Sequence, residues 1–139
     1  MDLVTSLPAE LRVSILRLSR RLRQEAAGQI TASQLSALGA VLRHGEISLG
    51  ELAAFERVAP PSMTRIASRL EEQGLVARVA DASDRRVARL VITPVGEELL
   101  NETRTRRDAF LAERIQLLSE EERHQLACAL PILERLASA

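Results

Sequence analysis

Hydrogen-bonding side chains follow two adjacent prolines in residues 59–65, which read APPSMTR. Ser62 and Thr64 carry hydroxyl groups, and Arg65 carries a planar guanidinium that can donate two parallel hydrogen bonds. Pairs of acceptors that match this fork occur on carboxylates, on phosphates and on the edge of guanine. These residue types therefore favour non-covalent recognition of a polar surface.

A second charged group lies between two short apolar runs, in residues 84–86. The long cations of Arg85 and Arg86 suit a narrow minor groove of DNA or its flanking phosphates. Asp84 cannot favour DNA by its own charge, so we expect it to hydrogen-bond a neighbouring arginine and fix its direction. Residues 57–89 hold seven arginines and four acids, a balance of +3, whereas the whole chain is neutral.

The composition bounds the kind of protein that carries these groups. The 139 residues are 46% apolar but only 1% aromatic, which predicts one domain with an aliphatic, mainly helical core. No apolar run approaches the roughly 20 residues that span a bilayer, and the N-terminus lacks a signal-peptide pattern. We therefore expect a cytoplasmic protein with no membrane partner.

The elements that must position the candidate residues can be predicted from spacing and from capping residues. An apolar stripe predicts a helix over about 8–27, and Thr31 with Gln34 reads as a capping box that starts a second helix. Further starts are predicted at Ser48, Pro60, Thr93 and Ser119. Residues 75–79 and 87–92 are rich in Val, Leu and Ile and predict a β-hairpin with a charged tip.

The two prolines begin a helix rather than end one, because the first backbone N–H groups of a helix have no intrahelical partner. Met63, Ile66, Ala67 and Leu70 recur at helical spacing and predict its buried face. The residues expected on or beside the opposite face are Pro61, Ser62, Thr64, Arg65, Ser68, Arg69 and Glu72.

This order of elements predicts a winged helix-turn-helix, a module that binds DNA by laying its second helix in the major groove. We expect Arg65 to fork onto guanine, and Ser62 and Thr64 to reach base edges or phosphate. Arg69 is better placed for the backbone. The DNA-binding candidates are Pro61, Ser62, Thr64, Arg65, Ser68, Arg69, Asp84, Arg85, Arg86 and Arg89.

The central block resembles the MarR family of bacterial transcription regulators. Residues 51–53 match the family's short scaffold helix, 61–65 its recognition helix and 70–78 its helix exit and first wing strand. The wing-tip signature is matched by 84–86, and the return strand with the next helix start by 90–96.

The resemblance implies a mainly α fold (α+β) with a small β-hairpin, a winged helix-turn-helix with flanking N- and C-terminal dimerisation helices. We expect residues 31–100 to form the DNA-binding module, and 1–30 with 101–139 to form the helical dimerisation region of one intertwined domain. The expected partners are double-stranded DNA, read at a pseudo-palindromic operator, and a second copy of the chain. The expected role is that of a repressor.

Members of this family often release DNA when a small, frequently phenolic ligand enters the crevice between the dimer helices and the winged module. Tyr and Trp are absent here, so only Phe55 and Phe110 offer rings. An aliphatic ligand and no ligand at all remain the alternatives. Some relatives sense oxidants through a cysteine in the first helix, whereas the single Cys128 lies in the last, which argues against such a switch.

Two other classes of function compete with this interpretation. A winged helix can serve as a protein-interaction module, but an outward face of Arg, Ser and Thr argues against one. No catalytic triad, phosphate loop or acid pair is apparent, so we expect no enzyme and no cofactor. His124 and Cys128 have a two-ligand metal spacing, but we interpret Cys128 as a small buried residue and His124 as an exposed one, and expect no metal.

Overall fold

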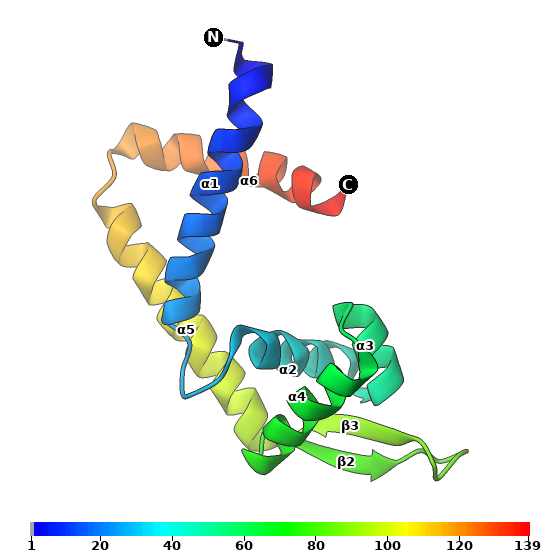
Figure 1. The fold of residues 1–139 in the computed structure, drawn as a ribbon. Helices are drawn as coiled ribbons and strands as arrows, with labels where there is room; N and C mark the ends of the chain where they lie inside the picture. The colour runs from blue at the N-terminus through cyan, green and yellow to red at the C-terminus, as the bar shows by residue number, and fades with distance from the viewer. Residues whose placement is uncertain (1) are drawn as a thin grey trace.

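The computed structural model describes residues 2–139. This part of the chain forms six helices and one antiparallel three-stranded sheet (Figure 1). The elements in chain order are α1 (Leu3–Gln24), α2 (Ala32–His44), β1 (Glu46–Ser48), α3 (Leu49–Glu56), α4 (Pro60–Glu72), β2 (Val76–Ala80), β3 (Ala88–Ile92), α5 (Pro94–Gln116) and α6 (Glu120–Ser138). The predicted mainly α fold with a winged helix-turn-helix is confirmed.

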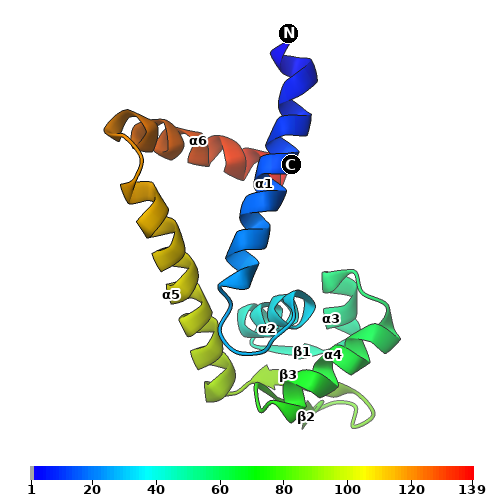
Figure 2. The ribbon, with the colours of Figure 1, turned by 60° about the vertical axis from the view of Figure 1, so that its left-hand side comes forward.

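The helices and the sheet divide into two groups that α5 connects. Figures 1 and 2 show α2, α3, α4 and the sheet gathered at one end of α5, and α1 and α6 toward its other end. The continuous buried core lies wholly within residues 37–90, whereas α1 and α6 contain no buried residue. None of the helices in residues 2–139 is long and apolar enough to cross a membrane.

The sheet has the strand order β1-β3-β2, and the predicted hairpin is its β2–β3 pair. Val76 pairs with Ile92 at one end of the hairpin and Ala80 with Ala88 at the other. The third strand, β1, extends the predicted hairpin to a three-stranded sheet, and Ile47 in β1 is buried against the core. A strand of three residues is too short for an alternating pattern, which is why the sequence did not indicate it.

Side-chain caps place most of the helix starts where the sequence predicts them. Thr31 with Gln34 and Ser119 with Glu122 form complete capping boxes, and the Thr93 hydroxyl accepts from the backbone N–H of Gly96. The predicted start of α1 near Pro8 is wrong. Asp2 caps this helix by accepting from the Val4 N–H, so that α1 begins at Leu3 and contains Pro8.

Helix α4 begins at the adjacent prolines, as predicted, with no side-chain cap. Proline supplies a fixed φ suited to a helix and leaves one fewer N–H to satisfy. Met63, Ala67 and Leu70 are buried in the core, and Ile66 is half-buried beside it. The buried face therefore fixes the rotation of α4 and sends the opposite face outward.

A close approach between backbones fixes the start of α5 against the turn after α4. A Cβ at Gly96 would collide with the carbonyl oxygen of Leu75, so only glycine fits. The Thr93 hydroxyl donates to the Gly74 carbonyl at 2.6 Å, and the Thr93 N–H donates to the Leu75 carbonyl at 3.1 Å. One close contact and two hydrogen bonds thus fix the start of α5 against residues 74–75, directly before the sheet strand β2.

Contacts between α1 and α5 attach the first helix to the rest of the chain. Arg107 Nε donates to the Leu22 carbonyl at 3.0 Å, and the Ala27 N–H donates to the buried Thr103 hydroxyl at 3.0 Å. Arg21 in α1 lies over the ring of the buried Phe110 in α5, with its guanidinium carbon 5.4 Å from the ring centroid. Polar and cation–π contacts thus hold the C-terminal end of α1 near α5.

Candidate nucleic-acid interface

The outward face of α4 carries the residues that were predicted from the sequence to recognise bases. Thr64, Arg65 and Arg69 are exposed, as is Pro61, and Ser62 is half-buried. Arg65 Nη2 donates to the Ser62 hydroxyl at 3.3 Å, and Thr64 Oγ1 donates to the Pro60 carbonyl at 3.0 Å. These contacts orient the side chains, and they leave donors of Arg65 free for a ligand.

Ser68 lies where α4 meets the first wing strand. Its hydroxyl accepts from Arg78 Nη2 at 3.3 Å, and Arg78 Nε also pairs with Glu71 Oε2 at 2.8 Å. Ser68 is half-buried and links the helix to β2. The structure therefore gives this predicted contact residue a partner within the chain.

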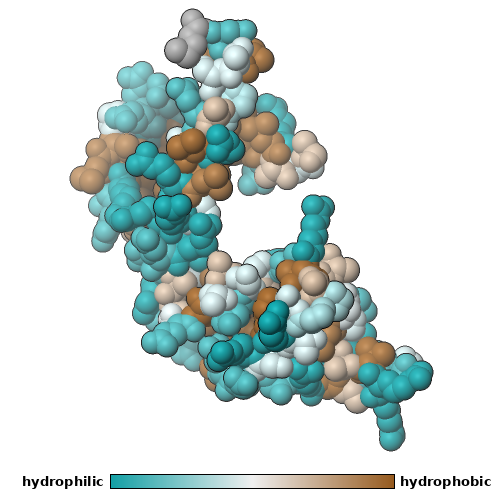
Figure 3. All heavy atoms as spheres, in the orientation of Figure 1, coloured by the Kyte–Doolittle hydropathy of each residue, from teal (hydrophilic) through white to brown (hydrophobic). Residues whose placement is uncertain are grey.

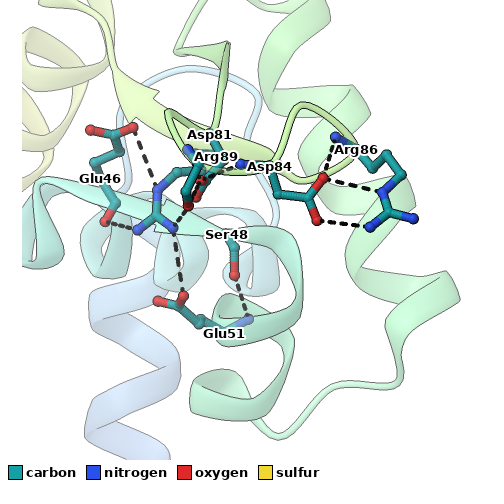
Figure 4. Close-up of polar contacts among 8 residues, drawn as sticks. Glu46, Ser48, Glu51, Asp81, Asp84, Arg86 and Arg89 are labelled. Carbon is teal, nitrogen blue, oxygen red and sulfur yellow. Dashed lines mark hydrogen bonds and ion pairs between the residues drawn. The ribbon is translucent and has the colours of Figure 1, made fainter.

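The wing tip shows the aspartate–arginine contact that the sequence predicts. Arg86 donates through Nε to Asp84 Oδ1 at 3.2 Å and through Nη2 to Oδ2 at 3.4 Å (Figure 4). The Arg86 side chain is nevertheless 91% exposed, so its charge projects into solvent. Arg85 is also exposed beside it. The wing tip therefore offers two cations, one of them oriented by a carboxylate.

Asp81 organises the turn of the wing, a role that sequence reasoning missed. Its Oδ1 accepts from the Ser83 N–H at 2.8 Å, from the Ser83 hydroxyl at 2.7 Å and from the Asp84 N–H at 3.1 Å. The Ser83 hydroxyl bond, the two N–H bonds and then Arg89 together lower the pKa of Asp81 from 3.8 to about 2. An aspartate two residues before a serine in a polar turn was the available signal.

Arg89, another predicted DNA contact, lies among carboxylates with only 23% of its side chain exposed. Its guanidinium pairs with Asp81 at 3.1 Å, with Glu46 at 3.4 Å and with Glu51 at 3.7 Å (Figure 4). Nη2 also donates to the Glu46 carbonyl at 3.4 Å. The structure thus separates Arg89 from the exposed arginines of the wing tip.

Arg57, in the turn between α3 and α4, is a candidate that sequence reasoning did not select. It is exposed and has φ of 55°, the one positive φ at a non-glycine residue within residues 2–139. A side chain in this left-handed region costs about 1 kcal/mol or more, and such strain is often found at functional sites. No sequence signal distinguishes this conformation, because the residue is not a glycine or an asparagine.

Ion pairing divides the seven arginines of residues 57–89 into two groups. Arg78, Arg86 and Arg89 pair with carboxylates. Within residues 2–139, no carboxylate lies at ion-pair distance from the other four of these seven, Arg57, Arg65, Arg69 and Arg85. These four lie on or between α3, α4 and the wing, and they supply the uncompensated positive charge.

A crevice of about 590 Å³ lies between α1, α2 and α5. Arg23, Arg43, Arg104 and Arg107 line it together with one acid, Asp108. No carboxylate in residues 2–139 lies at ion-pair distance from any of these arginines. Its apolar lining includes Leu35, Leu42 and Leu100. The crevice therefore combines excess positive charge with aliphatic surface.

The histidine and cysteine of α6 are close together but form no metal centre by themselves. Cys128 Sγ lies 3.6 Å from His124 Nε2. Cys128 is exposed in the single chain, so our interpretation of it as a buried residue is wrong: its helix face has nothing packed on it. Residues 2–139 contain no cluster of three or more side chains that could bind a metal.

Comparisons with known proteins agree with this geometry. A family model described as "MarR family" matches residues 30–88. An uncharacterized HTH-type transcriptional regulator of Mycobacterium bovis is 36% identical over 134 residues, covering 96% of this chain and 94% of its own. The HTH-type transcriptional repressor MdtR of Bacillus subtilis is 30% identical over 132 residues, covering 91% and 85% respectively. The structure of a MarR family protein from Bacillus stearothermophilus matches with a TM-score of 0.81 and 30% identity, over 100% of this chain and 99% of that one.

Proposed function

This chain belongs to the MarR family of HTH-type transcriptional regulators, and from this premise we propose that it represses transcription by binding double-stranded DNA as a homodimer. Its relatives carry the names of transcriptional regulators, and the chain is a regulator rather than an enzyme. The repressor role takes support from MdtR, whose name identifies that protein as a repressor.

The exposed face of α4 is the single observation that carries the DNA-binding proposal. Arg65 and Thr64 project from a helix whose start is fixed by two prolines and whose other face is buried. Because the helix cannot rotate without exposing its core residues, the side chains meet the major groove already oriented. Arg65 reads guanine, Ser62 and Thr64 contact base edges or phosphate, and Arg69 contacts the backbone.

The wing supplies the second part of the interface. Arg85 and Arg86 extend from the hairpin tip, which Figure 1 shows projecting away from α5. Their cations suit the minor groove or its flanking phosphates. Arg57, exposed at the turn before α4, adds a phosphate contact. Asp84 orients Arg86, whereas Ser68 and Arg89 act through contacts within the protein.

Unpartnered apolar side chains on α1 and α6 support the homodimer. These helices contain no buried residue, and Figure 3 shows hydrophobic surface at the end of the molecule where they lie. Many large apolar side chains exposed on two helices indicate an interface between proteins. The large apolar residues left exposed on the two helices are Leu3, Val4, Leu7, Val13, Ile15, Leu16, Leu18, Leu126, Leu130, Ile132 and Leu136.

We therefore propose that residues 31–100 form the DNA-binding module and that residues 1–30 and 101–139 form the dimer interface. A twofold dimer presents two α4 helices to half-sites about one helical turn apart, and this predicts a pseudo-palindromic operator.

The crevice beside α1, α2 and α5 is the proposed site of a small-molecule effector. Its four arginines lack carboxylate partners, and leucines form part of its wall. A small anion with an aliphatic body satisfies both features. Such a ligand would act at the joint between the helices proposed for dimerisation and the winged module.

Fluorescence anisotropy with a selected operator and a scrambled duplex tests the roles of single residues. Arg65→Ala should weaken operator binding by about 1–3 kcal/mol and leave the scrambled duplex nearly unaffected. Arg86→Ala should weaken binding to both duplexes, with less change in the preference for the operator over the scrambled duplex. Arg69→Ala is the matched control on the same helix and should also weaken both alike. Equal losses on both duplexes for Arg65→Ala would remove its base-reading role.

A further inference from the structure

We propose that Arg89 is a positioning residue, which holds the wing at a fixed angle to the helix-turn-helix and does not itself contact DNA. The proposal rests on the DNA-binding function proposed above. It concerns the cluster of Glu46, Glu51, Asp81 and Arg89, which joins the sheet to the start of α3 (Figure 4).

The guanidinium of Arg89 connects three separate elements. Arg89 lies in the central strand β3, Glu46 in β1 and Glu51 in the first turn of α3, while Asp81 follows β2 directly. Each outer nitrogen of the guanidinium has a partner, because Nη1 reaches Asp81 and Glu51, and Nη2 reaches the Glu46 carbonyl. Nε faces the Glu46 carboxylate. Every nitrogen of the guanidinium therefore already faces a partner within the protein, which disfavours an additional contact to a phosphate.

A continuous chain of contacts leads from this cluster to the wing tip. Asp81 accepts from Arg89 through Oδ2 and from the Ser83 and Asp84 N–H groups through Oδ1. Asp84 in turn accepts from the backbone N–H of Arg86 at 3.0 Å and from its guanidinium. The direction of the Arg86 cation is thus linked to α3 through these hydrogen bonds and the ion pair between Arg89 and Glu51.

The charges explain why an arginine is required at this position. Three carboxylates lie within 3.7 Å of one cation, so the cluster has more negative than positive charge. Removing Arg89 leaves these carboxylates to repel one another across the joint. A guanidinium has enough donors for all the partners, whereas an ammonium keeps the charge but has three donors and no planar fork.

Amide exchange in the free protein, measured by NMR, tests the proposal without DNA. Arg89→Gln should speed the exchange of the Ser83 and Asp84 amides roughly fivefold, since several partly exposed pairs are lost together. Arg89→Lys should recover part of the protection because it keeps the charge. Arg85→Gln, a neighbouring wing arginine without a carboxylate partner, is the matched control and should leave both amides unchanged.

The salt dependence of operator binding supplies a second readout. Arg85→Gln should reduce the slope of log K against log salt by about 0.9 per lost phosphate contact, whereas Arg89→Gln should lower affinity and keep the slope. A reduced slope for Arg89→Gln would make Arg89 a direct contact and overturn the proposal. Unchanged exchange of the Ser83 and Asp84 amides in Arg89→Gln would overturn it as well. An equal loss of protection at the core residues Leu38 and Val41 would also overturn it, since Arg89 would then stabilise the whole fold rather than position the wing. If the unaltered protein bound no duplex, the proposed function would fail, and amide exchange alone would decide whether Arg89 positions the wing.

Discussion

Arg57 combines an unfavourable backbone conformation with an exposed positive charge. A glycine would adopt its φ of 55° without a Cβ penalty, so Arg57→Gly should raise the free energy of unfolding by about 0.5–1 kcal/mol. The same change should lower DNA affinity roughly three- to tenfold, because a phosphate contact is lost. Urea unfolding and anisotropy measure the two effects separately.

Arg57→Asn serves as its control, because asparagine tolerates the left-handed region but carries no charge. The DNA affinity of Arg57→Asn should fall by the same factor as that of Arg57→Gly. Full affinity in both variants would show that the arginine contacts no phosphate.

Asp81 gives the wing a defined pH dependence. Because its pKa is lowered from 3.8 to about 2, the folded wing favours the ionised carboxylate. Its stabilising contribution is therefore complete above about pH 4 and is lost as pH falls toward 2. Exchange of the Ser83 and Asp84 amides, corrected for intrinsic rates, should rise over this interval. Asp81→Asn should abolish the pH dependence, and an unchanged profile in that variant would assign it to another group.

Single residues on one helix could be predicted from the sequence, whereas those held by distant partners could not. Helical periodicity alone indicated that Arg65 and Thr64 lie opposite the buried face. The partners of Arg89 include Glu46 and Glu51, which are about 40 residues away along the chain. No local pattern brings such residues together, because β1–β3 pairing does so.

At the scale of elements, alanine substitutions at two glycines are expected to have opposite effects on stability. Gly96→Ala should destabilise the fold by more than about 2 kcal/mol, because the new methyl group would meet the Leu75 carbonyl oxygen. Gly50→Ala, in helix α3 with open space at its Cβ, should stabilise it by about 0.5–1 kcal/mol. Thermal unfolding of both variants provides the comparison. An unchanged unfolding temperature for Gly96→Ala would contradict the close contact that fixes the start of α5 against Leu75.

Most elements could be predicted because their ends carry local chemical signals. Capping boxes at Thr31 and Ser119 and the prolines of α4 each specify a helix start within a few residues. Strand β1 carries no comparable signal, since three residues show no periodicity and Ser48 also caps α3. Long-range pairing to β3, rather than local preference, determines that it is a strand.

At the scale of the whole molecule, the exposed apolar faces of α1 and α6 predict the oligomeric state. Leu130 is 56% exposed in the single chain, so Leu130→Glu should leave the fold intact and disrupt the dimer. Val95→Glu, an equally exposed residue at the start of α5, is the control and should remain dimeric. Sedimentation equilibrium should give the mass of one chain for Leu130→Glu and of two for the control. A monomeric unaltered protein would contradict the homodimer.

Selection of bound duplexes from a random DNA pool tests the central claim most directly. The unaltered protein should recover a pseudo-palindrome whose two half-sites lie about one helical turn apart. Arg65→Ala under the same conditions should recover a degenerate sequence at the position that this side chain reads. Recovery of no common sequence by the unaltered protein, at a salt concentration where it still binds DNA, would contradict sequence-specific recognition by α4.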